Sequence, residues 1–216
     1  MQKLPSTAAL ILAAGSSSRM GAGRHKLLLP LGDRPVLAHV IDATLASQAR
    51  PIVIVLGHQA LLVRASLASY TTDPALTMID NADYLQGMST SLQVGLQALT
   101  NTTSPYTFDS VLIMLGDQPL ITARFIDILL ATRQTSQKRI LAPLYHGKRG
   151  NPILFDASLF PELMEVTGDE GGRSVIERHR QELATVELGD AVANYDVDTW
   201  EAYQEVVEEW KKNHEE

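Results

Sequence analysis

The sequence predicts an α/β fold with a mostly parallel, mixed β-sheet and helices on both of its faces. Two observations lead to this prediction. Up to residue 133, apolar runs bounded by turn residues alternate with segments of helical periodicity, which is typical of a parallel sheet. From residue 139 the pattern changes, because ILAPLYHGKRGNPILF (140–155) reads as two strands around a His-Gly-Lys turn. This hairpin would add antiparallel strands to the sheet.

The predicted elements of the first half follow in a regular order. Ala8–Ala14 is an apolar strand, and a helix is expected around Val36–Ser47, where apolar residues share one face. Ser110–Leu115 is nearly all apolar, as in a strand buried on both faces. The other elements are strand Pro51–Leu56, helix Gln59–Ala68, strand Leu76–Ile79, a helix from Ser89 to Leu99 that Ser89 would cap, and helix Ala123–Thr132.

The second half continues with short elements after the hairpin. They are helix Ala157–Met164, glycine-rich loop Gly168–Gly172, helix Arg173–Arg180, strand Leu183–Leu188, strand Tyr195–Val197 and helix Thr199–Trp210. Ligands of such sheets bind beyond the carboxyl ends of the strands. The loop after Ala14 and the turn after Leu115 both fall at that edge, so we expect the active site there.

Composition narrows the classes of function. A chain of 216 residues with 45% hydrophobic and 20% charged residues is ordinary for one globular enzyme domain, expected over residues 1–216. The net charge of −7 argues against a broad nucleic-acid surface and suits a small anionic ligand held by a local basic loop. The absence of cysteine excludes disulfides, thiolate metal sites and a cysteine nucleophile. With no signal-like segment and no run near the ~20 apolar residues of a membrane span, we expect a cytoplasmic protein.

The most informative segment is LILAAGSSSRMGAGRHKLLLP, residues 10–30. An apolar strand opens there into a loop of glycines and serines that carries Arg19, Arg24 and Lys26. Small residues let backbone N–H groups approach an anion, and the cations would neutralise further charge. The loop therefore predicts a polyphosphate site, with a flexible strand-to-helix connector as the alternative.

Two better-known phosphate loops do not fit this segment. A P-loop is excluded because five residues separate Gly15 from Gly21 and Lys26 is followed by leucine. In a dinucleotide fingerprint that starts at Gly21, Lys26 takes the third glycine position, and the expected ribose-binding acid is missing after the next strand. Neither a P-loop hydrolase nor a standard dehydrogenase is supported.

The spacing of this loop resembles a known family. LAAG-S-x-S-R-M-G, followed by Lys26 and LLLP, is similar to the signature of the MobA-like nucleotidyltransferases, which include the molybdenum cofactor guanylyl- and cytidylyltransferases. Ala14 resembles the cytidylyltransferase (MocA-like) branch, since the guanylyl branch usually has a glycine there. Matches extend from about Ala8 to Tyr203. The resemblance implies a three-layer α/β/α, Rossmann-like (GT-A-like) nucleotidyltransferase, with a nucleotide-binding half over about residues 8–133 and an acceptor-binding half over about 139–205.

Two segments offer carboxylates for a divalent cation. Asp117 follows a buried strand, and Mg²⁺ prefers oxygen ligands from one or two carboxylates together with phosphates and water. A turn aspartate is the alternative interpretation, but Asp117 matches the metal-binding aspartate of the family that the chain resembles. Asp196-Val197-Asp198-Thr199 offers a second carboxylate. We expect Asp198 to be the second ligand, with Asp196 as a further candidate; Asp198 would alternatively cap the last helix.

Three further motifs carry candidate binding residues. Gly87-Met88-Ser89-Thr90-Ser91 opens a helix whose first N–H groups and hydroxyls suit a nucleotide, with an ordinary helix cap as the alternative. The motifs at 149–152 and 168–173 read from their residues as a hairpin bulge and a helix-entry turn. The resemblance implies instead that these two motifs face the acceptor, with Asn151, Pro152, Gly168, Asp169 and Arg173 as binding residues.

The resemblance also implies a reaction. The phosphate of molybdopterin would attack the α-phosphate of CTP and expel pyrophosphate, with Lys26, Arg19 and Asp117 as the catalytic residues. Mg²⁺ would be the cofactor, held by Asp117 and Asp198. A molybdoenzyme of the xanthine dehydrogenase type would receive the product. The nucleotide-binding set is Ala13, Ala14, Gly15, Ser16, Arg19, Met20, Gly21, Lys26, Ser89 and Ser91.

Several alternatives remain open. GTP would replace CTP in a guanylyltransferase, and a sugar 1-phosphate or an isoprenoid precursor would replace molybdopterin in a related nucleotidyltransferase. A nucleotide-binding oxidoreductase, a label that similar sequences carry, would need NAD(P), against which the missing ribose acid argues. A non-catalytic chaperone would bind nucleotide or pterin without releasing pyrophosphate, and Lys26 and Asp117 argue against that version.

Overall fold

A mixed β-sheet of eight strands forms the centre of the computed structural model, which describes residues 6–21, 23–101, 107–189 and 195–214. Its strands are β1 (Thr7–Ala13), β4 (Ile52–Leu56), β5 (Leu76–Asp80), β6 (Ser110–Leu115), β7 (Ile140–Tyr145), β8 (Lys148–Arg149), β9 (Ile153–Asp156) and β10 (Leu183–Glu187). Hydrogen-bonded neighbours follow the order β10-β7-β9-β6-β1-β4-β5, and β8 pairs with β7. The pairs of β9 with β6 and β7, and of β8 with β7, are antiparallel, and the remaining pairs are parallel. The predicted mixed, mostly parallel sheet is confirmed.

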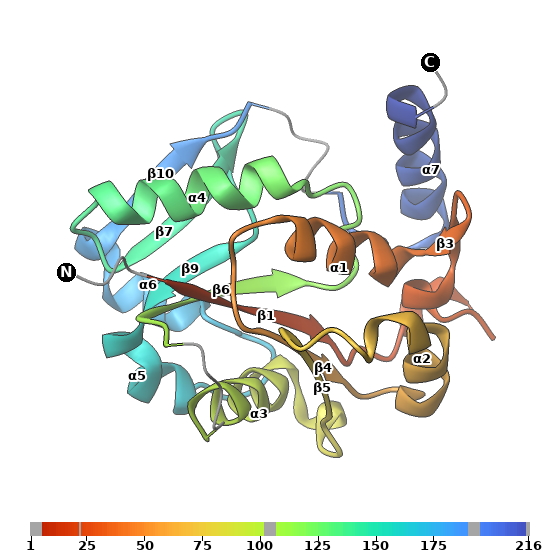
Figure 1. Cartoon of the computed structure of the whole chain (residues 1–216), viewed down its shortest axis with the longest axis horizontal. Coiled ribbons are helices and arrows are strands. Elements are labelled where there is room, and N and C mark those ends of the chain that lie inside the picture. Colours follow the sequence, from red (N-terminus) through yellow and green to blue (C-terminus); the bar gives the residue numbers. More distant parts are fainter. Residues whose placement is uncertain (1–5, 22, 102–106, 190–194, 215–216) are drawn as a thin grey trace.

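Helices cover both faces of this sheet, which gives three layers (Figure 1). One face carries α1 (Val36–Ala46), α2 (Ala60–Ser66) and α4 (Ala123–Thr135). The other face carries α3 (Met88–Asn101), α5 (Phe160–Met164) and α6 (Arg173–Arg178). Each layer of helices closes its own buried apolar cluster against the sheet, and side chains of β1 and β4 enter both clusters. The central strands are therefore buried on both faces, as their unbroken apolar runs predict.

The central strand β1 shows how closely the layers pack. All seven of its residues are buried, and it pairs in parallel with β4 on one side and β6 on the other. Helix α3 crosses it at Gly95, where an added Cβ would lie 2.3 Å from Leu10 Cδ1 and 3.0 Å from Val55 Cγ2. A glycine inside a helix costs helix propensity, and this close approach of helix to sheet is the physical reason for it.

The predicted hairpin forms, but its second strand is divided. His146 and Gly147 make the turn between β7 and the two-residue strand β8. The chain then leaves β7 at Asn151-Pro152 and returns as β9, between β6 and β7. Pro152 has no N–H to donate, so a continuous ladder through this point is not possible. The antiparallel hairpin expected around the His-Gly-Lys turn is confirmed, and its returning strand is divided into β8 and β9 at this proline.

The strand expected at Tyr195–Val197 is also wrong. This segment crosses the end of β6: the Val197 N–H donates to the Asp117 carbonyl at 2.9 Å, and the Val197 side chain is buried against Met20 and Tyr203. Helix α7 (Trp200–His214) follows directly, and Thr199 caps it because its Oγ1 accepts from the Ala202 N–H at 3.2 Å.

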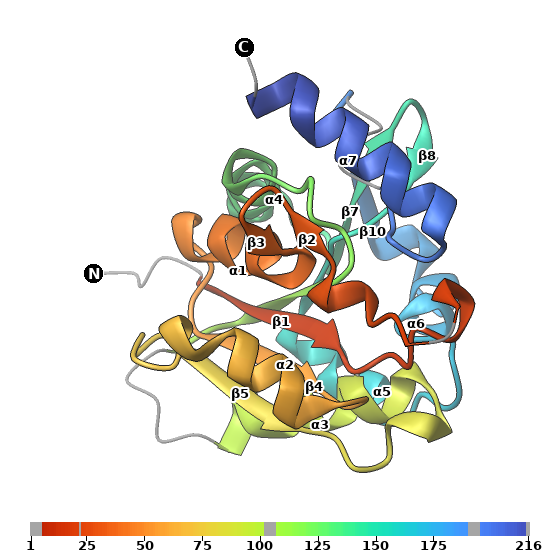
Figure 2. The ribbon, with the colours of Figure 1, turned by 90° about the vertical axis from the view of Figure 1, so that its right-hand side faces the viewer.

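Helix α7 lies against a small hairpin that the sequence analysis did not predict. The hairpin consists of β2 (Pro30–Leu31) and β3 (Arg34–Pro35), with Gly32 in its turn. An added Cβ on Gly32 would lie 2.5 Å from the Trp210 ring of α7. Figure 2 shows α7 beside this hairpin, at the end of the molecule where β1 ends. Within the described part of the chain, no helix combines the length and the apolar character that a bilayer crossing requires.

Candidate active site

The carboxyl ends of β1 and β6 place two predicted motifs side by side. Leu12 and Leu115 are partners in the parallel register, and the Gly116 N–H donates to the Leu12 carbonyl at 2.9 Å. The loop that follows Ala13 and the turn that carries Asp117 therefore emerge at the same edge of the sheet, as expected (Figure 2).

One ammonium group joins three distant parts of the chain at this edge. Lys26 Nζ donates to Asp117 Oδ2, and it also donates to Asp198 Oδ1 at 2.7 Å. Arg19 Nη1 donates to the other oxygen of Asp198 at 2.8 Å. These four residues, which we call the ion cluster, contain both predicted metal ligands and both predicted catalytic cations. Asp198 therefore does not cap α7, because its carboxylate is engaged here and Thr199 provides the cap.

The charges of the ion cluster stabilise one another. Burial of the Lys26 ammonium acts to lower its pKa, but the charges and hydrogen bonds of Asp117 and Asp198 outweigh burial and raise that pKa above its usual value. Burial acts to raise the pKa of Asp198, but hydrogen bonding to Lys26 and the charges of Lys26 and Arg19 lower it. The side chains of Lys26 and Asp198 are therefore both ionised at neutral pH.

Asp196 lies in the same cleft, with a different environment. Its Oδ1 accepts a hydrogen bond of 2.5 Å from Gln118 Nε2, and burial together with the nearby charge of Asp117 raises the pKa of Asp196 to about 6. Asp196 is not part of the ion cluster. Beside the two carboxylates of the ion cluster there is therefore a third, which accepts from Gln118, the residue directly after Asp117.

The loop 14–26, which we call the phosphate loop after the ligand that the sequence predicts for it, is organised from within by Ser17. Its Oγ accepts from the Lys26 N–H at 3.1 Å, and its carbonyl accepts from the Met20 N–H at 3.0 Å. Met20 is buried in the apolar cluster under α7, and neither Met20 nor Gly21 lines the cleft. Ala22 lies outside the described residues.

The third cation of this loop points away from the cleft. The Arg24 guanidinium carbon lies 4.2 Å from the centroid of the Trp200 ring, which is the geometry of a cation–π contact. Arg24 thereby links the phosphate loop to α7. The cations that line the cleft from this loop are Arg19 and Lys26.

The N-terminus of α3 contributes Ser91 to the cleft, and Ser89 lies below it. Ser91 Oγ accepts from Asn81 Nδ2 at 2.9 Å, which fixes this hydroxyl at the end of β5. Ser89 is buried and does not line the cleft. It is the second residue of the helix, so the expectation that Ser89 caps α3 was wrong.

The ion cluster, Asp196 and Ser91 line one cleft of about 760 Å³, to which both halves of the chain contribute. The first half contributes the phosphate loop, Asp117 and the start of α3, and the second half contributes the segment at 149–151 and the loop at 169–173. Predicted site residues that line the cleft are Ala13, Ala14, Gly15, Ser16, Arg19, Lys26, Ser91, Asp117, Asn151, Asp169, Arg173 and Asp198. Those outside its lining are Met20, Gly21, Ser89, Pro152 and Gly168.

Several cleft residues were not predicted. Tyr84, Leu85 and Met88 form an apolar rim, and Leu85 is 78% exposed although it is a large apolar residue. Arg149 adds a cation to the second half of the cleft. The signal in the sequence was the pair Tyr84-Leu85 shortly before Gly87, but no periodicity marks this short 3₁₀ segment.

The donor set fits a hard divalent cation bound together with phosphates. Asp117 Oδ1 is buried and has no hydrogen-bond partner among the described residues, and Asp198 offers a second carboxylate. The described residues contain no group of three His, Cys, Asp or Glu side chains arranged to hold a metal by themselves. Mg²⁺ commonly uses one or two carboxylates and completes its shell with water and substrate phosphates, so two carboxylates suffice.

Among known proteins, one relative matches nearly the whole chain and another matches about half of it. Nicotine blue oxidoreductase of Paenarthrobacter nicotinovorans is 30% identical over 208 residues, which are 92% of this chain and 95% of that protein. 2-C-methyl-D-erythritol 4-phosphate cytidylyltransferase of Prochlorococcus marinus is 40% identical over 121 residues, which are 55% of this chain and 49% of that protein.

Solved structures share the fold. Rv0371c of Mycobacterium tuberculosis H37Rv superposes with a TM-score of 0.79 at 26% identity, over 96% of this chain and 100% of that one. Its complex with manganese superposes with a TM-score of 0.75, also at 26% identity, over 95% and 100% of the two chains. The sequence profile of the MobA-like NTP transferase domain matches residues 9–183. The chain therefore belongs to the MobA-like NTP transferase family.

Proposed function

We propose that this protein is a nucleotidyltransferase that transfers CMP from CTP to the phosphate of molybdopterin and releases pyrophosphate. The observation that carries the proposal is the position of the ion cluster. It lies where the phosphate loop meets the end of β6, in a cleft to which both halves of the chain contribute. A triphosphate bound on the first half would thus have its acceptor beside it on the second half. The division into a nucleotide-binding half over about residues 8–133 and an acceptor-binding half over about 139–205 is part of this proposal.

The reaction requires alignment and charge neutralisation more than covalent help from the protein. An oxygen of the acceptor phosphate forms a bond to the α-phosphorus, the bond from that phosphorus to the bridging oxygen of the β-phosphate breaks, and pyrophosphate leaves with the electron pair. Lys26 and Arg19 would bind the β- and γ-phosphates together with the N–H groups after Ala14. An acceptor phosphate is already ionised at neutral pH, so no side chain has to remove a proton.

Asp117 and Asp198 would hold the divalent cation. When bound, this cation, Mg²⁺ or Mn²⁺, supplies positive charge to the phosphates and thereby favours departure of pyrophosphate. Lys26 and Arg19, which donate to these carboxylates, would supply two further positive charges. Four charged side chains from three separate segments would then determine where the triphosphate lies.

Substrate identity is supported by fewer residues. Ala14 stands where the guanylyl branch usually has glycine, which favours CTP over GTP. On the acceptor side, Asn151 and Arg173 line the second half of the cleft, where Arg173 offers a cation for the acceptor phosphate. A molybdoenzyme of the xanthine dehydrogenase type is the proposed recipient of the product.

The test is pyrophosphate release with Mg²⁺ and molybdopterin, with CTP and GTP offered separately and the dinucleotide identified by mass. We expect turnover with CTP. Turnover with GTP alone would overturn the assignment of the base and keep the reaction. A folded protein that releases no pyrophosphate with either nucleotide would overturn the proposal for this acceptor.

A second candidate is the same transfer to a different phosphorylated acceptor. It is favoured by the 40% identity, over 55% of this chain, to a cytidylyltransferase whose named substrate is 2-C-methyl-D-erythritol 4-phosphate. Offering that compound and sugar 1-phosphates with CTP separates this candidate from the first. Oxidation or reduction coupled to NAD(P) is measured in parallel, because one full-length relative is named an oxidoreductase.

A further inference from the structure

The first turn of α3 has its N–H groups satisfied from the other half of the chain. The first N–H groups of a helix lack partners within the helix and need other acceptors. The Met88 N–H donates to Asp169 Oδ1 at 3.0 Å, and the Ser89 N–H donates to the Gly168 carbonyl at 2.9 Å. Both acceptors lie about 80 positions further along the chain. The loop 168–172, which we call the acceptor loop, therefore caps the helix that carries Ser91.

Backbone approaches backbone at this contact. Gly87 has φ +111°, and an added Cβ there would lie 2.5 Å from the carbonyl atoms of Gly168. An added Cβ on Gly171 would lie 3.1 Å from Met88 Sδ. The two segments thus meet where no side chain fits between them. Any residue larger than glycine at position 87 would push the acceptor loop off the helix.

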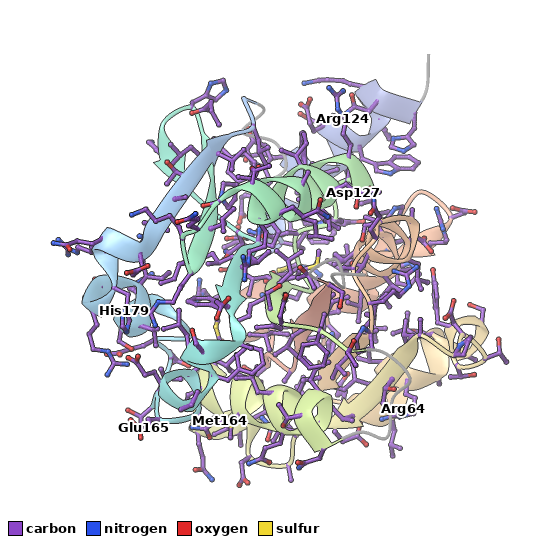
Figure 3. The ribbon with its side chains drawn as sticks, turned by 60° about the vertical axis from the view of Figure 1, so that its left-hand side comes forward. Arg64, Arg124, Asp127, Met164, Glu165 and His179 are labelled. Carbon is purple, nitrogen blue, oxygen red and sulfur yellow. The ribbon has the colours of Figure 1, made fainter. Side chains whose placement is uncertain are left out.

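The segment that leads into the acceptor loop is anchored on the same helix. Gln93 Nε2 donates to the Met164 carbonyl at 3.0 Å and to the Val166 carbonyl at 2.9 Å. Figure 3 shows Met164 beside α3, at the end of α5. Together with Asp169, these contacts hold the chain against α3 on both sides of residue 167.

This arrangement links the two sides of the cleft. Ser91 lines the cleft from α3, and Arg173, directly after the acceptor loop, lines it from the second half. We propose that Asp169 is a positioning residue that docks the acceptor loop on α3 and so couples the nucleotide site to the acceptor site. The sequence analysis expected Asp169 to bind the acceptor itself. The names of the two sites rest on the proposed function, whereas the docking contact does not.

The experiment uses amide hydrogen exchange on the full chain, alone and with CTP and Mg²⁺. Asp169→Ala removes the cap, and we expect exchange at the amides of 88 and 89 to become about fivefold faster or more. Asp169→Asn keeps an oxygen that accepts the same hydrogen bond, so its exchange should stay close to that of the wild type. Glu170→Gln is the matched control, because it removes a negative charge from the same loop without touching the cap.

Coupling between the nucleotide site and the acceptor site is measured with the same variants. In the wild type, binding of CTP should slow hydrogen exchange in the acceptor loop. This protection should be lost in Asp169→Ala and restored in Asp169→Asn. Gly87→Ala, which keeps the carboxylate but separates the backbones, should behave like Asp169→Ala. Unchanged exchange in Asp169→Ala, or failure of Asp169→Asn to restore protection, would overturn the positioning role.

Kinetics separate positioning from direct contact. A positioning role predicts that Asp169→Ala raises the KM of the acceptor and that Asp169→Asn returns it to within about twofold of the wild type. An equal rise of the acceptor KM in Asp169→Ala and Asp169→Asn would mean that the charge of Asp169 contacts the acceptor. A wild-type protein that binds no nucleotide would refute the proposed function, while exchange at 88 and 89 in the free protein would still decide whether Asp169 docks the loop.

Discussion

Lys26 Nζ lies 2.7 Å from Asp198 Oδ1, although 172 positions separate the two residues in the chain. The same ammonium donates to Asp117 Oδ2, so one cation neutralises both carboxylates that we assign to the divalent metal. A metal ion that binds these carboxylates must compete with this ammonium. The lysine that would bind the phosphates of the nucleotide thus also donates to both proposed metal ligands.

This competition predicts an unusual result for metal binding. Lys26→Met should bind Mn²⁺ more tightly than the wild type in the absence of nucleotide, by about tenfold, because a nearby positive charge is removed from two carboxylates. Calorimetric titration with Mn²⁺ measures this directly. Arg19→Ala should give a smaller gain, since of the two carboxylates Arg19 pairs with Asp198 and not with Asp117, and its side chain is 73% exposed. Weaker Mn²⁺ binding in Lys26→Met would show that the lysine organises the carboxylates instead of competing for them.

Loss of either partner of this ion pair should impair turnover. Lys26→Ala and Asp117→Ala should each lower the rate of pyrophosphate release by about 10²–10³, which is the usual effect of removing one transition-state stabiliser. Lys148→Ala is the matched control, because Lys148 is exposed on β8 and does not line the cleft. A folded Lys26→Ala protein with wild-type turnover would remove Lys26 from the proposed mechanism.

Local sequence patterns predicted most of the fold, and they were wrong where a long-range contact decides the structure. Strands β1, β4 and β6 were predicted correctly because strands buried on both faces of a parallel sheet are apolar throughout. The segment Tyr195–Val197 looks like a strand, but Val197 bonds to the Asp117 carbonyl and is buried under α7. No local pattern encodes that contact. The short hairpin at 30–35 was missed for the same reason, since packing against Trp210 accompanies it.

The site was predictable where its charged residues lie in a loop or turn that begins at the end of a strand. Lys26 and Asp117 lie at the same sheet edge because β1 and β6 are parallel neighbours, and alternating strands and helices indicate such an edge. Ser89 and Asp169 were assigned to ligands from the resemblance of their motifs to the family. In the structure Ser89 is buried, and Asp169 accepts a hydrogen bond from the first turn of α3. A cap supplied from 81 positions away leaves no signal in either local sequence.

The buried side chain of His39 should make the free energy of unfolding depend on pH below about 6.5. Burial lowers the pKa of His39 below its usual 6.5, in a site where Nε2 donates to the Leu31 carbonyl at 2.7 Å. The nearby charges of Arg34 and His214 lower this pKa further, and Asp42 opposes them. Below pH 6.5 the unfolded chain binds a proton at this position that the folded protein resists. The contribution to stability is therefore complete above pH 6.5 and is lost as the pH falls towards the folded pKa.

The corresponding test compares urea unfolding of His39→Gln and wild type at pH 7.5 and pH 5.5. The glutamine amide can still donate to the Leu31 carbonyl, but it does not titrate, so the variant should lose less stability on acidification. His146→Gln serves as the control, because His146 is exposed in the turn after β7 and its removal leaves the buried packing intact. An equal loss of stability in His39→Gln and wild type would show that another group causes the pH dependence.

The packing of α3 on β1 predicts that a helix-favouring substitution destabilises this protein. Alanine is a better helix former than glycine by about 1 kcal/mol. At position 95, however, the added Cβ would lie 2.3 Å from Leu10 Cδ1, and because Leu10 is fully buried its side chain can shift only by disturbing the core around it. Overpacking of a core typically costs about 1–3 kcal/mol, so after the helix gain is subtracted Gly95→Ala should lower the free energy of unfolding by up to about 2 kcal/mol. The control is Gln97→Ala, on the exposed face of the same helix. This substitution should change the free energy of unfolding by no more than about 0.5 kcal/mol. Urea unfolding monitored by circular dichroism measures both variants. A Gly95→Ala protein more stable than the wild type would mean that α3 lies further from the sheet than Gly95 permits.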